Sequence, residues 1–171
     1  ATDSRLFSIL CTMRSPFTPT LLLLLAVSGN GLASNANMNL EQSVCGFKEP
    51  LIFWLWSNQA GRPDKGRLLG MENIEDILFR TSDERILRGY RLNATGGGVP
   101  TAAKGYLLVL QGNAMLADQI IPAFKDYADA GYDVYLYDYR GYGRSEGRRR
   151  LKAIVSDYQE IVQQLANESY R

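Results

Sequence analysis

The chain has 171 residues, of which 46% are apolar and 22% are charged, and its formal net charge is +1. This length and composition are typical of one globular domain and exclude wholesale disorder. The near-neutral charge supplies no global field for nucleic acid, so no nucleic-acid partner is expected. Two cysteines and no histidine exclude a disulfide framework and any Cys/His zinc site, and neither cysteine is expected to have a chemical role.

Residues 1–36 have the pattern of an export signal. Arg14 supplies a positive charge, and residues 21–27 form an unbroken apolar run. Small residues at 34–36 fit a signal peptidase site, with cleavage after Ala36. The apolar run is shorter than the ~20 residues that cross a bilayer. We expect upstream residues plus an export signal here, and a periplasmic or secreted protein; an uncleaved anchor is the alternative.

Residues 37–67 are interpreted as an N-terminal extension and linker. The stretch PLIFWLW, residues 50–56, is a dense apolar run of only seven residues. It predicts either a short helix packed on the domain, which is favoured, or a membrane-surface patch, because tryptophan favours interfaces. The second interpretation would make a peripheral membrane contact through Trp54 and Trp56. Residues 61–66 are typical of an irregular linker.

A regular pattern of strands begins near residue 74. Residues 74–80 and 86–92 alternate in polarity around a short polar turn, which predicts an antiparallel hairpin. The glycines of 96–100 are expected to break the chain. Residues 105–110 are a continuous apolar run bounded by glycine, which predicts a strand buried on both faces, as in a parallel sheet.

Two helices flank the next predicted strand, residues 134–137. The first is expected to begin near Asp118 and to stop at Gly131, with one face made by Ile120, Ile121, Phe124, Tyr127 and Ala128. The second carries a helical stripe of Leu151, Ile154, Val155, Tyr158, Ile161, Val162 and Leu165. Residues 68–171 therefore predict an α/β domain with an antiparallel opening hairpin, followed by parallel strands and crossover helices.

The loop GYGRSEG, residues 141–147, contains the letters of a G-x-S-x-G nucleophile elbow around Ser145. An elbow needs a strand that ends at the serine and a helix that begins directly after it. Here residues 138–144 intervene, and the chain has no histidine to act as base. Ser145 is therefore expected to be a loop serine with local hydrogen bonds rather than a nucleophile. A phosphate-binding loop is also disfavoured, because the glycine spacing is one residue too long.

The turn after the buried strand, residues 110–115, reads LQGNAM. Ligands of open α/β sheets bind at the carboxyl ends of strands. Gly112 would let the backbone turn so that the next amides point into that crevice, where they could stabilise an oxyanion. An ordinary strand-to-helix turn is the alternative of equal weight.

The basic run at residues 148–150 stands at the start of the last predicted helix, against the preference of the helix dipole. A solvated charged surface is the expected explanation. A phosphate or anionic-lipid contact is the alternative.

Three segments, in order, resemble the α/β-hydrolase superfamily, in its lysophospholipase-like and serine-aminopeptidase-like branch. Residues 74–90 are similar to the opening hairpin, and residues 108–114, LVLQGNA, to the oxyanion strand and turn. Residues 138–147, DYRGYGRSEG, are similar to the D-x-R-G-x-G-x-S-x-G loop after the fourth strand. The resemblance runs from about Leu68 onward. Gln111 stands where that family usually has a structural histidine.

The resemblance implies that the backbone N–H of Asn113, or of Ala114, is one oxyanion donor. It implies a structural loop made by Asp138, Arg140, Gly141, Gly143, Ser145 and Gly147. The serine nucleophile, the acid and the histidine are expected beyond Arg171. No catalytic residue, cofactor or metal is then expected within this chain.

The function that follows from the resemblance is that of a serine hydrolase on an ester, amide or thioester, with a small-molecule or lipid-like acyl substrate. This chain would be its N-terminal portion and would be inactive alone. The first alternative is a non-catalytic truncated α/β protein that binds a partner or a membrane surface. A nucleotide-binding domain is a weaker one.

Overall fold

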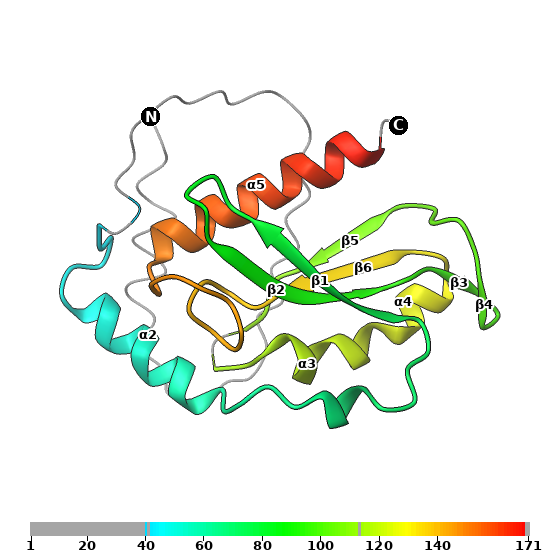
Figure 1. Cartoon of the computed structure of the whole chain (residues 1–171), viewed down its shortest axis with the longest axis horizontal. Coiled ribbons are helices and arrows are strands. Elements are labelled where there is room, and N and C mark those ends of the chain that lie inside the picture. Colours follow the sequence, from blue (N-terminus) through cyan, green and yellow to red (C-terminus); the bar gives the residue numbers. More distant parts are fainter. Residues whose placement is uncertain (1–39, 41, 113, 170–171) are drawn as a thin grey trace.

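The computed structural model describes residues 40, 42–112 and 114–169 (Figure 1). The expected export signal at residues 1–36, and Asn113, lie outside the described residues. The described part contains a four-stranded sheet in the order β1-β2-β6-β5 and a separate two-stranded ladder. Antiparallel strands come first and a parallel pair follows, which confirms the predicted α/β class.

The opening hairpin has the predicted bounds. Strands β1 (Ile74–Arg80) and β2 (Ile86–Leu92) pair antiparallel along their whole length. β2 then pairs antiparallel with β6 (Asp133–Tyr137). At Gly89 a Cβ atom would lie 2.2 Å from the main-chain oxygen of Leu136. The close approach of these two strands therefore requires glycine at this position.

Strand β5 (Tyr106–Val109) pairs parallel with β6, every residue of which is buried. The connection between them is not the single helix that the pattern predicted. It consists of α3 (Ala117–Ile120), the 3-10 helix η2 (Ile121–Phe124) and α4 (Lys125–Asp129). Pro122 has no N–H for an α-helical bond and tightens this turn. Tyr127 is 50% exposed as a result, not on the buried face.

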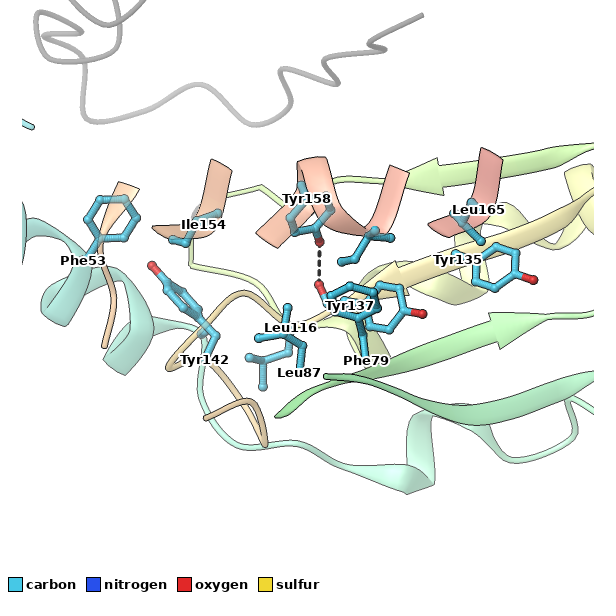
Figure 2. Close-up of a cluster of buried hydrophobic side chains, with 12 residues drawn as sticks. Phe53, Phe79, Leu87, Leu116, Tyr135, Tyr137, Tyr142, Ile154, Tyr158 and Leu165 are labelled. Carbon is cyan, nitrogen blue, oxygen red and sulfur yellow. Dashed lines mark hydrogen bonds between the residues drawn. The ribbon is translucent and has the colours of Figure 1, made fainter. Parts of the chain in front are cut away.

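The two faces of the sheet are covered by different helices (Figure 1). Tyr135 and Tyr137 pack with α5 (Leu151–Ser169) in one core cluster. Val134 and Leu136, which alternate with them, pack with α3, η2 and α4 in the other. In Figure 2 the Tyr158 hydroxyl of α5 donates to the main-chain oxygen of Tyr137, 2.8 Å away. This bond fixes the position of α5 over the end of β6.

The N-terminal extension forms α2 (Lys48–Gln59), and Phe53 of this helix and the following Ala60 pack in the same core cluster as α5. This agrees with the favoured interpretation of residues 50–56. The expected linker at 61–66 includes the start of the 3-10 helix η1 (Lys65–Leu68). Cys45 is disulfide-bonded, which the sequence did not predict.

The glycine-rich segment at residues 96–100 is more ordered than its composition indicates. Instead of a simple break in the chain, it forms a short antiparallel ladder of β3 (Thr95–Gly96) and β4 (Val99–Pro100). Gly97 and Gly98 make the turn, both with positive φ.

Candidate functional site

The loop of residues 138–147 follows β6 directly and wraps around the side chain of Asp138. The Asp138 residue is only 3% exposed, and its Oδ1 accepts a hydrogen bond from the Ala117 N–H at 2.8 Å. With the nitrogen of its amide turned toward this carboxyl, Gln111 donates to the same oxygen at 3.2 Å. Gly143 has φ +50°, and a Cβ there would lie 2.2 Å from Asp138 Oδ2. The loop can close over the carboxyl only because position 143 is glycine.

Ser145 joins this loop to strand β2. Its hydroxyl donates to the Asp138 carbonyl at 2.7 Å and accepts from the Arg88 N–H at 2.9 Å. The next residue, Glu146, continues the attachment: its N–H donates to Ile86 O at 2.9 Å, and its carboxylate accepts from Ile86 N at 3.1 Å. Ser145 is 8% exposed. Its hydroxyl therefore bridges two parts of the backbone.

Arg140 holds together three elements of the fold. Its guanidinium, 5% exposed, makes a bidentate pair with Asp83 in the β1–β2 turn, at 2.6 and 2.9 Å. Arg140 Nε also donates to Asp157 Oδ2 of α5 at 2.9 Å, and its NH2 group contacts the second oxygen of the same carboxylate. This fork geometry is particular to arginine, and it fixes the hairpin, the loop and α5 relative to one another.

Asp83 and Asp138, two of the carboxyl groups around this loop, have pKa values shifted in opposite directions. The hydrogen bonds from Arg140 lower the pKa of Asp83 to about 2, against the opposing effect of partial burial. Burial raises the pKa of Asp138 to about 6, although the hydrogen bond from Ala117 N–H favours its charged form. One carboxylate beside the loop is therefore stabilised by a cation, and the one inside the loop is destabilised by loss of water.

The turn of residues 111–115 lies beside this loop, since β5 and β6 are parallel and their carboxyl ends share one edge of the sheet. The Tyr139 hydroxyl donates to the Gln111 carbonyl at 2.6 Å, which ties the turn to the loop. Ala114 has φ +58°, a left-handed conformation that is rare for a residue other than glycine. Such strained backbone is concentrated at functional sites. The turn can present main-chain N–H groups at the sheet edge, with Ala114 as the described candidate donor and Asn113 outside the described residues.

The charged partners of the site were not identified from the sequence. Asp157 lies three residues from Ile154 and one from Tyr158 on the apolar stripe of α5, and it is 1% exposed. A single carboxylate on an apolar stripe could have indicated a buried ion pair. Its partner in the structure is Arg140, the arginine of the D-x-R-G motif. Asp83 lies in residues 74–90, the segment that resembles the opening hairpin of the family, but the resemblance implied no role for it.

Glu49 explains why three arginines can precede helix α5. This residue of α2 is 1% exposed, and its Oε1 accepts from the Leu151 N–H at 3.1 Å. Its other oxygen accepts from Val44 N at 2.6 Å and Cys45 N at 3.0 Å. The negative charge that the helix dipole favours therefore comes from a distant segment. Of the basic run, Arg149 donates from Nε to Gly141 O at 2.8 Å.

Within the ranges that the structure describes, no group of three or more His, Cys, Asp or Glu side chains is arranged to hold a metal ion. A search of the same ranges finds no helix that is both long enough and apolar enough to cross a bilayer.

Comparison with protein families matches residues 101–171 to the serine aminopeptidase S33 family. Two uncharacterized proteins from strains of Mycobacterium tuberculosis are each 29% identical to this chain over 128 residues. These alignments cover 70% of the chain and 43% of each relative. The chain thus spans less than half the length of the curated relatives that it matches.

Among solved structures, an α/β hydrolase from Vibrio vulnificus superposes with a TM-score of 0.55 at 18% identity, over 76% of this chain and 46% of that protein. The α/β hydrolase GrgF from a Penicillium species is 26% identical, with a TM-score of 0.44, over 53% of this chain and 31% of its own. The first likeness shows the fold, and the second superposition is too weak to add to it. Together with the sheet order, the Vibrio likeness shows that this chain has part of an α/β-hydrolase fold, in agreement with the match of residues 101–171 to the serine aminopeptidase S33 family.

Proposed function

We propose that the chain is the N-terminal part of a serine hydrolase that cleaves an ester, amide or thioester through an acyl-enzyme. The observation that carries the proposal is the turn of residues 111–115, which stands at the carboxyl end of a parallel strand with Ala114 in a left-handed conformation. The match to the serine aminopeptidase family over residues 101–171 supports it. A main-chain N–H of Asn113 or Ala114 would donate to the oxyanion of the tetrahedral intermediate.

In this proposal the nucleophile, its base and the acid come from outside these 171 residues. The chain contains no histidine. Ser145 uses its hydroxyl both as donor, to Asp138 O, and as acceptor, from Arg88 N. A serine elsewhere would attack the acyl carbon and lose its proton to a histidine, which returns that proton to the leaving group. Water then releases the acyl group from the serine by the reverse sequence.

The loop of residues 138–147 would have a positioning role. Asp138 accepts from Ala117 N–H, just after the turn, and Tyr139 holds the Gln111 carbonyl, at its start. Both ends of the candidate oxyanion turn are thus attached to one rigid loop. A donor must be held in place before the reaction to stabilise charge efficiently, and these two bonds supply that support.

The test is labelling of the intact protein with a fluorophosphonate probe, followed by peptide mass spectrometry and assay with a nitrophenyl ester. We expect one labelled serine, outside residues 1–171, and no labelling of the 171-residue chain alone. Ser145→Ala should leave the labelling of the intact protein unchanged. A probe adduct on Ser145, or ester turnover by the isolated chain that Ser145→Ala abolishes, would overturn the proposal.

A non-catalytic α/β protein is the second candidate function. The observation that favours it is the structural use of Ser145, whose hydroxyl donates to Asp138 O and accepts from Arg88 N. The same experiment separates the two candidates. If no serine of the folded, intact protein reacts with the probe, the non-catalytic function is supported and the hydrolase is rejected.

A further inference from the structure

Helix α2 has an apolar face that is exposed along its length. Phe47, just before the helix, is 86% exposed, and Leu51, Trp54 and Leu55 are 64%, 54% and 48% exposed. The spacing i, i+4, i+7, i+8 puts these four side chains on one side of a helix. We call them the α2 outer face. Figure 1 shows α2 at the periphery of the fold, away from the centre of the sheet.

The opposite side of α2 accounts for its attachment to the fold. Phe53 is 9% exposed within the α5 cluster, and Trp56 packs edge-on against it with ring centroids 5.6 Å apart. Of the two tryptophans, Trp54 is therefore the one on the outer face, whereas Trp56 is part of the packing. An exposed apolar patch of this kind marks a surface that contacts another protein or a membrane.

The charge around this face is positive. Among residues 42–63 the charged side chains are Lys48, Glu49 and Arg62. Glu49 is buried and accepts hydrogen bonds from main-chain N–H groups, whereas Lys48 and Arg62 are exposed. The exposed charges of residues 42–63 are thus both cations, Lys48 and Arg62, because Glu49 is buried on the packed side of α2.

We propose that the α2 outer face docks the protein on the surface of an anionic lipid bilayer. Leucine and aromatic side chains on one face with cations at the rim are the pattern of helices that lie in the plane of the membrane interface. Tryptophan is favoured at that depth. A helix of 12 residues is too short to cross the bilayer, so it would lie flat, with Lys48 near the lipid phosphates.

The first test is sedimentation of the intact protein with phosphatidylcholine vesicles, with and without phosphatidylglycerol. We expect binding to the anionic vesicles, with partitioning reduced about tenfold by Leu51→Gln or Trp54→Gln. Leu78→Gln is the matched control, because Leu78 is 63% exposed on β1 and far from α2 in sequence. No binding, or equal losses in the Leu51 and Leu78 variants, would overturn the proposal.

A second test uses tryptophan fluorescence of the 171-residue chain, which has only two tryptophans. In Trp56→Phe, emission from Trp54 should shift to the blue with anionic vesicles and be quenched by brominated lipid. In Trp54→Phe, the remaining Trp56 should show neither change. If Trp54 is already protected from acrylamide without lipid, another part of the protein or a second copy covers the face, and the proposal fails.

The charge requirement is tested with Lys48→Gln. This variant should lower affinity for anionic vesicles and weaken the salt dependence of binding. Lys125→Gln, at a distant lysine paired with Asp129, is the control. An unchanged salt dependence in Lys48→Gln, or an equal change in both variants, would count against a cationic rim.

Discussion

The loop after β6 and the turn after β5 stand side by side but are built in opposite ways. In the loop, buried side chains bond to one another and to the backbone: Arg140 to two carboxylates, and Ser145 to two main-chain groups. In the turn, the notable feature is the backbone itself, left-handed at Ala114. The segment with the letters of a catalytic motif is thus a scaffold. The candidate oxyanion site is the neighbouring turn of residues 111–115, whose sequence does not resemble a nucleophile motif.

Arg140→Met should give the largest effect on the loop side of this comparison. It leaves Asp157, 1% exposed, as an uncompensated buried charge, so we expect a loss of about 3–5 kcal/mol in the free energy of unfolding. Arg80→Met is the control, because the Arg80–Glu84 pair is exposed and should be worth at most about 1 kcal/mol. Urea unfolding measures both. Similar losses in the two variants would show that the Arg140 fork does not organise the loop.

Gly143→Ala should be next in size. It combines a left-handed φ of +50° with a Cβ only 2.2 Å from Asp138 Oδ2. Gly97→Ala has the same backbone problem, φ +63°, with nothing within 4 Å, and should cost about 1–2 kcal/mol. The difference between the two variants in thermal or urea unfolding isolates the contact with Asp138. If they are equal, the loop is not closed tightly on that carboxyl.

The stability of the protein should depend on pH through Asp138. Its pKa is about 6 in the folded state, against an ordinary value near 3.9, so the folded state binds more protons between pH 4 and 6. Its contribution therefore lowers stability as pH rises through this window, by about 2–3 kcal/mol. In Asp138→Asn this decline should be absent.

Asp83 provides the internal contrast for the pH experiment. Its folded pKa is lowered to about 2, so its contribution has the opposite sign and is lost as pH falls from about 4 to about 2. Urea unfolding of the wild type and of Asp138→Asn at several pH values separates the windows. If the free energy of unfolding changes with pH in the same way in the wild type and in Asp138→Asn between pH 4 and 6, Asp138 does not titrate in that range.

Ser145→Ala should have a moderate effect on stability alone. The variant loses the bond to Asp138 O and leaves the Arg88 N–H without its hydroxyl acceptor, a loss of about 1–3 kcal/mol. At a temperature where the variant is folded, kcat of the intact protein should equal that of the wild type. A fall in kcat with unchanged stability would reverse the roles of loop and turn.

Ala114→Gly should have the smallest effect on stability and the clearest effect on the turn. Glycine relieves the left-handed strain of the folded state but also increases the conformational freedom of the unfolded chain. These two effects nearly cancel, so we expect the free energy of unfolding to change by no more than about 1 kcal/mol. Glu84→Gly, at φ +64° in the β1–β2 turn, is the matched control. Only Ala114→Gly should lower kcat, with KM little changed. Equal kinetics in both variants would count against an oxyanion role for the turn.

Local patterns account for the parts of the fold that the sequence predicted well. The hairpin was predicted with its observed bounds because alternation and turn residues are short-range signals. The helix α5 was confirmed for the same reason, with Ile154, Tyr158, Ile161 and Leu165 buried, but Val155 of the predicted stripe is 36% exposed. The helix after β5 was wrong in form, since Pro122 splits it into two α-helical segments around a 3-10 turn.

The candidate site was less predictable, because its contacts join residues far apart in the chain. The letters of residues 138–147 indicated a loop, but not that Arg140 meets Asp83 and Asp157. Nothing local to Glu49 indicates that it accepts from Leu151. These partners depend on the three-dimensional arrangement of elements, which periodicity does not encode.

The bond between Glu49 and the start of α5 also has a consequence for the order in which the protein folds. Its two residues are 102 positions apart, so during synthesis the glutamate emerges long before its partner. Until α5 has been synthesised, Glu49 cannot accept a hydrogen bond from Leu151 N–H. Phe53 of α2 also cannot pack in its core cluster, because α5 supplies part of that cluster. Docking of the first described helix is therefore a late event that waits for the last one.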